Sequence, residues 1–477
     1  MDKTVKPTID EMLRIKSVAI IGVSANMGYY WVYSMLQWEH DLKVWLISKT
    51  PGEVLGHKIY SSLDEIPEPI DYAIIAVPYH AVPKVLDDAA AKGAKGVTIF
   101  TSGFSELGTE EGKRRELELR EQIKGLNLRV LGPNCMGLLY PRIGMAFMPT
   151  IKRLSGNVGL LSQSGGVVIT TYTAAVESGV GISKIFSFGN SSDIAPPELL
   201  SYFENDDETE VVGIYIEGIK QGKTFLENLT SLSQKKPVVA VKGGRSDAGT
   251  RAVSSHTGAL AGSNEIWKAV FHQANVPIVD TLEELVATLS VFSKCPPPRS
   301  RNTAIIAISG GTSVVYTDLC IEAGLSIPPS SESTTSKLRE MMQSVGNAVG
   351  NPIDLASDYY SDQILSEVIK TVGADPAFDS IIMQADVHNI HQVAKIMDAE
   401  EEVEYLWGVM AKAGKDVMDK YDKPVLVAIP EVAYPEARMK AWNQFVGEGL
   451  PVFRNFEEAI GALVKACEYY ETKEERQ

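Results

Sequence analysis

Three stretches of the chain share one pattern: VAIIGVSANMG (18–28), VGLLSQSGGVV (158–168) and AIIAISGGTSV (304–314). Each is a short run of apolar, often β-branched residues, followed by a Gly/Ser turn and a helix-like segment. This order is typical of a buried parallel strand that leads into a helix. The first glycines of the turns, Gly22, Gly165 and Gly310, are spaced 143 and 145 residues apart. The pattern predicts an α/β fold of three consecutive doubly wound, parallel-sheet domains.

Other apolar runs supply the remaining strands. They are expected at 43–47, 72–77, 96–100 and 129–132 in the first domain, at 181–189, 211–218 and 237–244 in the second, and at 380–386 and 424–430 in the third. The segment CPPPRSR (295–301) is the clearest linker, because three consecutive prolines end any helix or central strand. We therefore expect domains over 10–145, 150–295 and 302–470.

Composition and charge exclude several classes of function. The chain of 477 residues has 45 Lys and Arg against 61 Asp and Glu, a net charge of −16. This acidic balance argues against a general binder of nucleic acid or of anionic membranes. No apolar run approaches the roughly 18 residues of a membrane span. The start, MDKTVKPTIDEML, has no apolar core of a signal peptide.

The cysteines indicate a reducing compartment. The four of them (Cys135, Cys295, Cys320 and Cys467) are far apart and form no CxxC pair. Disulfides and structural zinc sites are therefore not indicated, and a cytoplasmic location is predicted.

The first domain has features of a site for a nucleotide-like ligand. The turn IGVSANMG presents Gly22, Ser24 and Gly28 where a strand meets a helix, and backbone amides there can hold a phosphate. A dinucleotide fold usually has Asp or Glu at the end of its second strand, but here Lys49 follows it. A lysine favours a phosphate near the ribose, so NADP and coenzyme A (CoA) both fit better than NAD.

Small residues follow the other strands of the first domain. They are Val77-Pro78, Thr101-Ser102-Gly103 and GPNCMG (132–137), and ligands of open α/β sheets bind outside such strand ends. Cys135 has no histidine within its motif. We therefore expect Cys135 to be a turn residue that faces the ligand rather than a nucleophile.

The second domain contains the candidate catalytic and phosphate-binding residues. SQSGG places Ser164, Gly165 and Gly166 at a helix start, where free amides and the helix dipole favour an anion. After the strand PVVAVKGG come about 19 residues rich in Gly, Ala, Ser and Thr, including SSHTGALAG (254–262). So long a loop in an α/β domain is usually functional or mobile. We expect it to present His256 on a flexible arm.

His256 suits nucleophilic or proton-transfer chemistry. Its neighbours offer no further metal ligands, so no metal site is predicted. A nucleophilic imidazole needs a carboxylate on its other nitrogen, and Glu217, at the end of VVGIYIEG, is the best candidate. Its strand is expected to end on the same rim as Ser164. His388 and His391 have no accompanying ligands and are interpreted as ordinary residues.

These motifs together resemble one family. GPNCMG, SQSGG, SFGN with Asp193, YIEG and SSHTGALAG occur in the order and spacing of the α subunit of nucleoside-diphosphate-forming acyl-CoA synthetases, the superfamily of ADP-forming acetyl-CoA synthetase and succinyl-CoA synthetase. SGGTSVVYTDLCIEAGL and GNPIDL in the third domain also match. The resemblance covers about residues 15–468. It implies a Rossmann-like CoA-binding domain followed by two flavodoxin-like domains.

The resemblance implies a role for each matched residue. His256 is similar to the histidine that becomes phosphorylated, Glu217 to the acid that steadies it, and Ser164, Gly165 and Gly166 to the phosphate-binding helix start. The implied CoA-lining residues are Gly22, Ser24, Asn26, Lys49, Val77, Pro78, Ser102, Gly103, Asn134 and Cys135. The family's ligase reaction, acyl-CoA + phosphate + ADP giving acid + ATP + CoA, is reversible and passes through an acyl phosphate and a phosphohistidine.

The family resemblance also implies a partner. An ATP-grasp β subunit is expected to hold ADP or ATP with magnesium, in an α2β2 assembly, because no such unit is found in this chain. The chain departs from the family in its first glycine loop, where ANMGYYWVYSML (25–36) has aromatic residues in place of a basic one. Ligases of acetate, succinate, a hydroxy acid or an aryl acid would all use these same residues.

Two other functions fit part of the sequence. A CoA-binding regulatory module without catalysis would use the first domain alone, but it leaves His256, Glu217 and SQSGG without purpose. An NADP-dependent dehydrogenase would explain Lys49, but it leaves SSHTGALAG unexplained.

Overall fold

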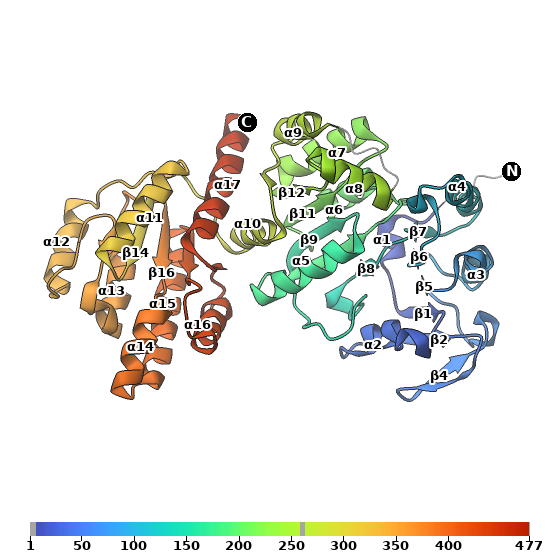
Figure 1. The fold of residues 1–477 in the computed structure, drawn as a ribbon, viewed down its shortest axis with the longest axis horizontal. Helices are drawn as coiled ribbons and strands as arrows, with labels where there is room; N and C mark the ends of the chain where they lie inside the picture. The colour runs from blue at the N-terminus through green and yellow to red at the C-terminus, as the bar shows by residue number, and fades with distance from the viewer. Residues whose placement is uncertain (1–5, 258–262, 477) are drawn as a thin grey trace. The chain divides into compact units, whose positions relative to one another are not determined.

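The computed structural model describes residues 6–257 and 263–476, and for residues 254–257 and 401 it describes the backbone alone. The chain divides into two compact units: Met1–Val176 with Gly181–Leu282, and Glu177–Val180 with Glu283–Gln477. The first unit contains two sheets and the second unit contains one, each with helices on both faces (Figure 1). The predicted fold class is thus confirmed, while the domain ranges 10–145, 150–295 and 302–470 stay predictions.

The first domain is a Rossmann-like sheet. The order β4-β2-β1-β5-β6-β7 is parallel throughout and corresponds to the dinucleotide-binding order 3-2-1-4-5-6. An additional strand, β3, pairs antiparallel with β4 at the edge. The strands are β1 (Ser17–Ile21), β2 (Lys43–Ile47), β3 (Gly52–Val54), β4 (His57–Tyr60), β5 (Tyr72–Ile75), β6 (Gly96–Ile99) and β7 (Arg129–Leu131). The helices are α1 (Ile9–Met12), α2 (Tyr30–Leu36), α3 (Val82–Ala91) and α4 (Glu110–Lys124).

The second domain has the flavodoxin-like order. Its parallel strands are arranged β10-β9-β11-β12-β13, which is 2-1-3-4-5 in chain order. They are β9 (Ser155–Ser162), β10 (Ile182–Ser187), β11 (Val211–Ile216), β12 (Val238–Lys242) and β13 (Ile278–Val279). The helices are α5 (Gly165–Glu177), α6 (Pro196–Asn205), α7 (Gly222–Lys235), α8 (Asp247–Thr257) and α9 (Asn264–Gln273).

The third domain repeats this order in the second unit. Its strands run β15-β14-β16-β17-β18, again 2-1-3-4-5, and are β14 (Thr303–Ala307), β15 (Ile353–Asp354), β16 (Ser380–Gln384), β17 (Val425–Ala428) and β18 (Val452–Phe453). The helices are α10 (Leu282–Lys294), α11 (Gly310–Glu322), α12 (Glu332–Met341), α13 (Asp362–Gly373), α14 (Val387–Met397), α15 (Glu400–Tyr421), α16 (Pro435–Gly447) and α17 (Phe456–Glu475). Buried aliphatic and aromatic side chains of β14–β18 and of α12–α16 form one core.

Two antiparallel strands depart from the predicted parallel sheets. Besides β3, the short strand β8 (Gly137–Leu139) follows the GPNCMG turn of the first domain and pairs antiparallel with β10 of the second, with Leu138 opposite Phe186. The Met136 amide donates to Ser187 Oγ at 3.1 Å. The first unit is therefore one body, because a strand next to the first sheet completes the second.

The prediction of a long loop around His256 is wrong for most of the length of that segment. Residues 247–257 form α8. Ser246 Oγ accepts a hydrogen bond of 3.1 Å from the Gly249 amide, Asp247 lies in the first turn, and Val253 is buried. These capping and anchoring contacts outweigh the Gly/Ser content that suggested a loop. Residues 258–262 of the expected arm lie outside the described residues.

Among the described residues, no helix is long and apolar enough to cross a membrane.

Candidate functional site

The start of α5 has a geometry that is suited to binding an anion. Ser162 Oγ donates to the Ser164 carbonyl at 2.8 Å, which fixes the turn between β9 and the helix. A Cβ on Gly165 would lie 2.9 Å from Met136 Cγ, whereas Gly166 faces open space. The first amides of this 13-residue helix have no intrahelical acceptor, so they and the helix dipole favour a phosphate beside Ser164, Gly165 and Gly166.

Glu217 lies directly beside this turn. Strand β11 pairs with β9, so Tyr215 is opposite Ser162, and Gln163 Oε1 accepts hydrogen bonds from the amides of Glu217 (2.9 Å) and Gly218 (3.1 Å). The Gln163 side chain therefore joins the ends of the two strands. The structure places Glu217 and Ser164 on one rim, in the arrangement that the sequence predicts.

The Glu217 carboxylate is buried, with 4% of its surface exposed. Its Oε1 accepts a hydrogen bond of 3.2 Å from Tyr215 Oη. Within the part of the chain that the structure describes, Oε2 has no hydrogen-bond partner. A buried carboxylate oxygen without a donor is costly, so this geometry favours a donor that arrives from elsewhere.

Tyr215, Gln163 and Lys242 belong to the site, and sequence reasoning missed them. Lys242 is buried, its Nζ donates to the Gly243 carbonyl, and it lies 5.3 Å from the centre of the Trp267 ring. Burial lowers the pKa of Lys242 to about 8, while the nearby Glu217 charge opposes this shift. Two signals were available in the sequence: Tyr215 lies two residues before Glu217 on one strand face, and Lys242 is the one charge in an apolar strand.

His256 is in the last turn of α8, but its side chain lies outside the described residues. Helix α8 packs against the 3-10 turn η4 (Ser105–Leu107) of the first domain. The chain enters α8 through Gly243, where a Cβ would lie 2.5 Å from Tyr215 Oη and 3.2 Å from Glu217 Cγ. The segment that leads into the helix that includes His256 thus passes within contact distance of Glu217.

The first glycine loop offers a small anion-binding turn. Gly22 has φ +105, and a Cβ there would overlap the Ala76 carbonyl, so only glycine fits. The Gly22 and Val23 amides both donate to the Ile47 carbonyl. A phosphate would therefore contact the turn from Ser24 to Asn26, the segment that leads into the 3-10 turn η1 (Ala25–Met27).

The other predicted CoA-lining residues lie at the carboxyl ends of the same sheet. Lys49 follows β2 and is exposed, and Thr101 Oγ1 donates to the Val77 carbonyl at 2.6 Å, which holds the ends of β5 and β6 together. The residues at this rim are Val77, Pro78, Ser102, Gly103 and Asn134. Their position outside the strand ends agrees with the general rule for ligands of open sheets.

Cys135 differs from its predicted orientation. Its side chain is 3% exposed and Sγ lies 3.8 Å from the Ile99 carbonyl, so the thiol faces the protein interior rather than a ligand. Burial raises the pKa of the thiol to about 12. Cys135 is therefore a turn residue, as predicted, and any contact it makes with a ligand is through its backbone.

Metal ligation finds no support in the described ranges, which contain no group of three or more His, Cys, Asp or Glu able to hold an ion. His388 and His391 contact the Tyr434 ring instead, at 5.8 and 4.8 Å between ring centres.

Comparisons with known proteins agree with this geometry. Residues 16–141 match a family described as a CoA binding domain, and residues 155–292 match a succinyl-CoA ligase like flavodoxin domain. The α subunit of acetate–CoA ligase (ADP-forming) II from Pyrococcus furiosus is 33% identical over 93% of this chain and 99% of its own length. The α subunit of isoenzyme I is 33% identical, over 96% of both chains.

Longer relatives and solved structures extend the comparison. Acetate–CoA ligase (ADP-forming) from Methanocaldococcus jannaschii is 38% identical over 72% of this chain, which spans about half (48%) of that relative. A dinucleotide-forming acetyl-CoA synthetase from Candidatus Korarchaeum cryptofilum, solved with phosphate and ADP, has a TM-score of 0.81 and 27% identity, over 98% of this chain and 97% of its own.

Proposed function

The chain belongs to the family of ADP-forming acetate–CoA ligase α subunits, which are acid–thiol ligases, and we propose that it binds CoA and carries the phosphoryl group of the reaction on His256. The observation that supports this proposal most is the buried Glu217 carboxylate beside the amide-rich start of α5, because one of its oxygens has no donor among the residues that the structure describes. The relatives are catalytic ligases, which supports this function over a regulatory module or a dehydrogenase.

The proposed reaction has two steps on this chain. A phosphate oxygen attacks the acyl-CoA carbonyl, the C–S bond breaks, and the thiolate takes a proton to become CoA. An imidazole nitrogen of His256 then attacks the phosphorus of the acyl phosphate, and the carboxylate leaves. Glu217 Oε2 accepts the hydrogen bond from the other ring nitrogen and stabilises the positive charge that forms there, while the amides of Gly165 and Gly166 hold the phosphoryl oxygens.

CoA itself is proposed to bind across the rim of the first sheet. The turn from Ser24 to Asn26 faces the pyrophosphate, and Lys49 faces the 3′-phosphate of the ribose. Val77, Pro78, Ser102, Gly103 and Asn134, with the backbone of Cys135, line the path toward Ser164. The Asn134 side chain is close to Asn190 of the second domain (3.5 Å between Nδ2 and Oδ1), which brings this path to the junction of the two sheets.

The second half of the reaction needs a partner. We infer an ATP-grasp β subunit that holds ADP and magnesium and receives the phosphoryl group from His256, in an α2β2 assembly. The names of the relatives as α subunits support a partner subunit. The four cysteines are free thiols, three of them buried, which supports a cytoplasmic location.

Labelling with radioactive phosphate tests the proposal. The chain, incubated with an acyl-CoA and labelled phosphate with its partner added, is expected to gain an acid-labile, base-stable label that His256→Asn abolishes. His272→Asn is the matched control and retains the label. A label that persists in the His256 variant would overturn the mechanism.

A further inference from the structure

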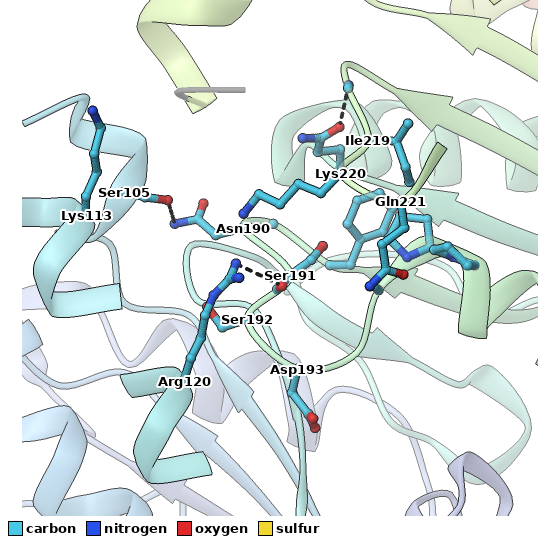
Figure 2. Close-up of a pocket in the computed structure, with 17 residues that line it drawn as sticks. Ser105, Lys113, Arg120, Asn190, Ser191, Ser192, Asp193, Ile219, Lys220 and Gln221 are labelled. Atoms are coloured by element: carbon cyan, nitrogen blue, oxygen red, sulfur yellow. Dashed lines mark hydrogen bonds between the residues drawn. The ribbon is translucent and has the colours of Figure 1, made fainter. Parts of the chain in front are cut away.

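We propose that a cavity between the first and second domains binds the acyl part of the substrate, and that Arg120 and Lys220 select a carboxylic acid with a second anionic group. This inference rests on the proposed function, because it assigns the substrate class of the same site. The cavity has a volume of about 710 Å³ (Figure 2). It is lined by residues from α4, from η4, and from the loops after β9, β10 and β11.

Two residues that line the cavity are neighbours in sequence of the catalytic cluster, the name used here for Ser164, Gly165, Gly166, Glu217 and His256. Gln163 lines it and directly precedes Ser164, while Gly218 lines it and directly follows Glu217. In an acyl phosphate a single oxygen joins the phosphorus to the carbonyl carbon. A phosphoryl group held between Ser164 and Glu217 therefore has its acyl group within a few ångströms of these two residues, and the cavity is the space that opens there.

The cavity has a much larger volume than an acetate ion would occupy. At about 30 Å³ per water, an acetate ion of roughly two waters would occupy about 60 Å³. A volume of 710 Å³ lies in the ordinary range of sites for larger organic ligands. Phe188, Pro196, Pro197 and Ile219 supply apolar surface for a carbon chain.

Arg120 and Lys220 bring positive charge to the lining of the cavity. Arg120 Nη2 donates to Glu116 Oε1 at 2.7 Å, and Lys220 Nζ lies 3.7 Å from the same oxygen. One buried carboxylate is therefore shared by two cations. Lys113 also lines the cavity, but it pairs with Glu110 at 2.7 Å. In Figure 2, Arg120 extends from α4 and Lys220 from the loop after β11, so the two cations approach the cavity from different elements.

The acid on the lining does not cancel this charge. Asp193 accepts from Lys6 Nζ at 2.7 Å and from Arg129 Nε at 3.0 Å, so its own charge is already compensated. Partial desolvation of the amine and then the Arg120 charge lower the pKa of Lys220, while Glu116 raises it. An anion bound between Arg120 and Lys220 would relieve the repulsion between the two cations.

Two buried polar atoms belong to residues that line the cavity. Among the described residues, the buried atoms Arg120 Nε and Ser192 Oγ have no hydrogen-bond partner. Both residues line the cavity, and α7 begins at its edge with Gln221 as an N-cap that makes no side-chain bond. A carboxylate bound beside either atom would accept its hydrogen bond and so satisfy an otherwise costly group.

Calorimetric titration of the purified chain tests the assignment. Glutarate, a five-carbon dicarboxylate, is expected to bind at least tenfold more tightly than pentanoate, which has the same chain and one carboxylate. Arg120→Gln and Lys220→Gln are each expected to weaken glutarate binding about tenfold or more. Arg114→Gln, on the same helix, and Lys223→Gln, at the start of α7, are the matched controls and should bind like the parent chain.

Inorganic phosphate is titrated as a separate arm, because it shares the anionic chemistry. Loss of phosphate binding in the Arg120 and Lys220 variants, with no glutarate binding by the parent chain, would assign the cavity to phosphate and overturn the proposal. Equal affinity for glutarate and pentanoate, or glutarate binding that survives both substitutions, would overturn it as well. Lys220 is mostly exposed, so its variant remains informative if the Arg120 variant does not fold.

Failure of this proposal is distinguishable from failure of the proposed function. Labelling of His256 from an acyl-CoA and phosphate depends on the catalytic cluster and not on Arg120 or Lys220 as such. A chain that is labelled at His256 but does not prefer dicarboxylates retains its function and loses only the assignment of the cavity.

Discussion

Tyr215 Oη donates a hydrogen bond of 3.2 Å to Glu217 Oε1, and this bond leaves Glu217 Oε2 as the oxygen without a partner in the described part of the chain. Tyr215 is on β11 and Glu217 directly follows the strand two residues later, so their side chains point to the same face of the sheet. The phenol thereby fixes which carboxylate oxygen is presented to the catalytic rim. Tyr215 is a positioning residue in this arrangement, because it acts through Glu217.

Removal of this hydroxyl is expected to slow phosphoryl transfer. A hydrogen bond to a charged group contributes about 1.5–3 kcal/mol, so Tyr215→Phe should reduce the rate of His256 labelling roughly tenfold or more. CoA affinity, measured by calorimetry, should not change. Tyr172→Phe removes a different buried hydroxyl, which donates to the Lys152 carbonyl at 3.0 Å, and should leave the rate unaltered. Equal loss in the two variants would assign Tyr215 a purely structural role.

Substitution of the carboxylate itself should have a larger effect. Glu217→Gln keeps the shape of the side chain but removes the charge that stabilises the imidazolium, so labelling of His256 is expected to fall by at least a hundredfold while CoA still binds. The measurement is single-turnover labelling beside a CoA titration. Loss of both activities to the same extent would indicate a folding defect instead.

Cys135 is expected to be unreactive. Burial raises the pKa of its thiol to about 12, so the thiolate is negligible at pH 8, and the thiol stays protonated until the pH approaches that value. Mass spectrometry after treatment of the native chain with iodoacetamide at pH 8 should find Cys135 unmodified, while the denatured chain is modified. Cys135→Ala should retain His256 labelling. Rapid native alkylation would contradict the buried placement.

The stability of the chain should depend on pH through Lys242. Its folded pKa is about 8, whereas a lysine in the unfolded chain titrates near 10.5. Between these values the unfolded chain binds a proton that the folded chain has released, so the free energy of unfolding rises with pH across this window. Lys242→Met removes the buried charge. The Tm of this variant is therefore expected to exceed that of the parent chain at pH 7, and the difference is expected to disappear toward pH 10.

Thermal melting of both chains between pH 7 and pH 10 measures this difference. Lys223→Met, which removes an exposed lysine, is the control and should differ from the parent chain by the same amount at every pH. A constant difference for Lys242→Met would show that its amine does not titrate in this range.

Asp193 is expected to hold the two domains of the first unit together. Arg129 on β7 donates from Nε to Asp193 at 3.0 Å and pairs with Glu198 at 2.7 Å, and Lys6 also binds Asp193. Asp193→Ala leaves the buried Arg129 with Glu198 alone as its carboxylate partner and removes the partner of the half-buried Lys6, and the loss of a hydrogen bond between charged groups typically costs about 1.5–3 kcal/mol. Denaturant unfolding should show this loss, and the exposed control Asp207→Ala should not. A change below about 1 kcal/mol would contradict a binding role for Asp193 between the domains.

The parts of the molecule that repeat a strong pattern could be predicted from the sequence. The three strand–turn–helix openings became β1, β9 and β14 with the turns after them, because a β-branched apolar run followed by glycine has few alternatives in a parallel sheet. Glu217 and Ser164 were placed on one rim because the strands of such a sheet end together. These inferences depend on the regular period of the backbone rather than on particular side-chain contacts.

The remaining features depend on contacts between distant residues. The strand β8 is only three residues long, and its pairing with β10 is set by tertiary packing that no local pattern reports. The helix α8 was missed because its Gly/Ser content suggested a loop, whereas Ser246 caps it and Val253 anchors it. Arg120 and Lys220 are a hundred residues apart, so the charge they share with Glu116 becomes visible only in the folded chain.

The strand β8 also limits where the chain can be divided into separate recombinant domains. A recombinant second domain that begins at Ser155 would lack β8, and β10 would become an unpaired edge that invites aggregation. A first domain that ends at Leu131 would lack the turn that carries Asn134. Exchange of the CoA-binding half between relatives therefore requires that the incoming half bring a β8 matched to the β10 of its host, so the two halves are expected to be inherited together rather than shuffled.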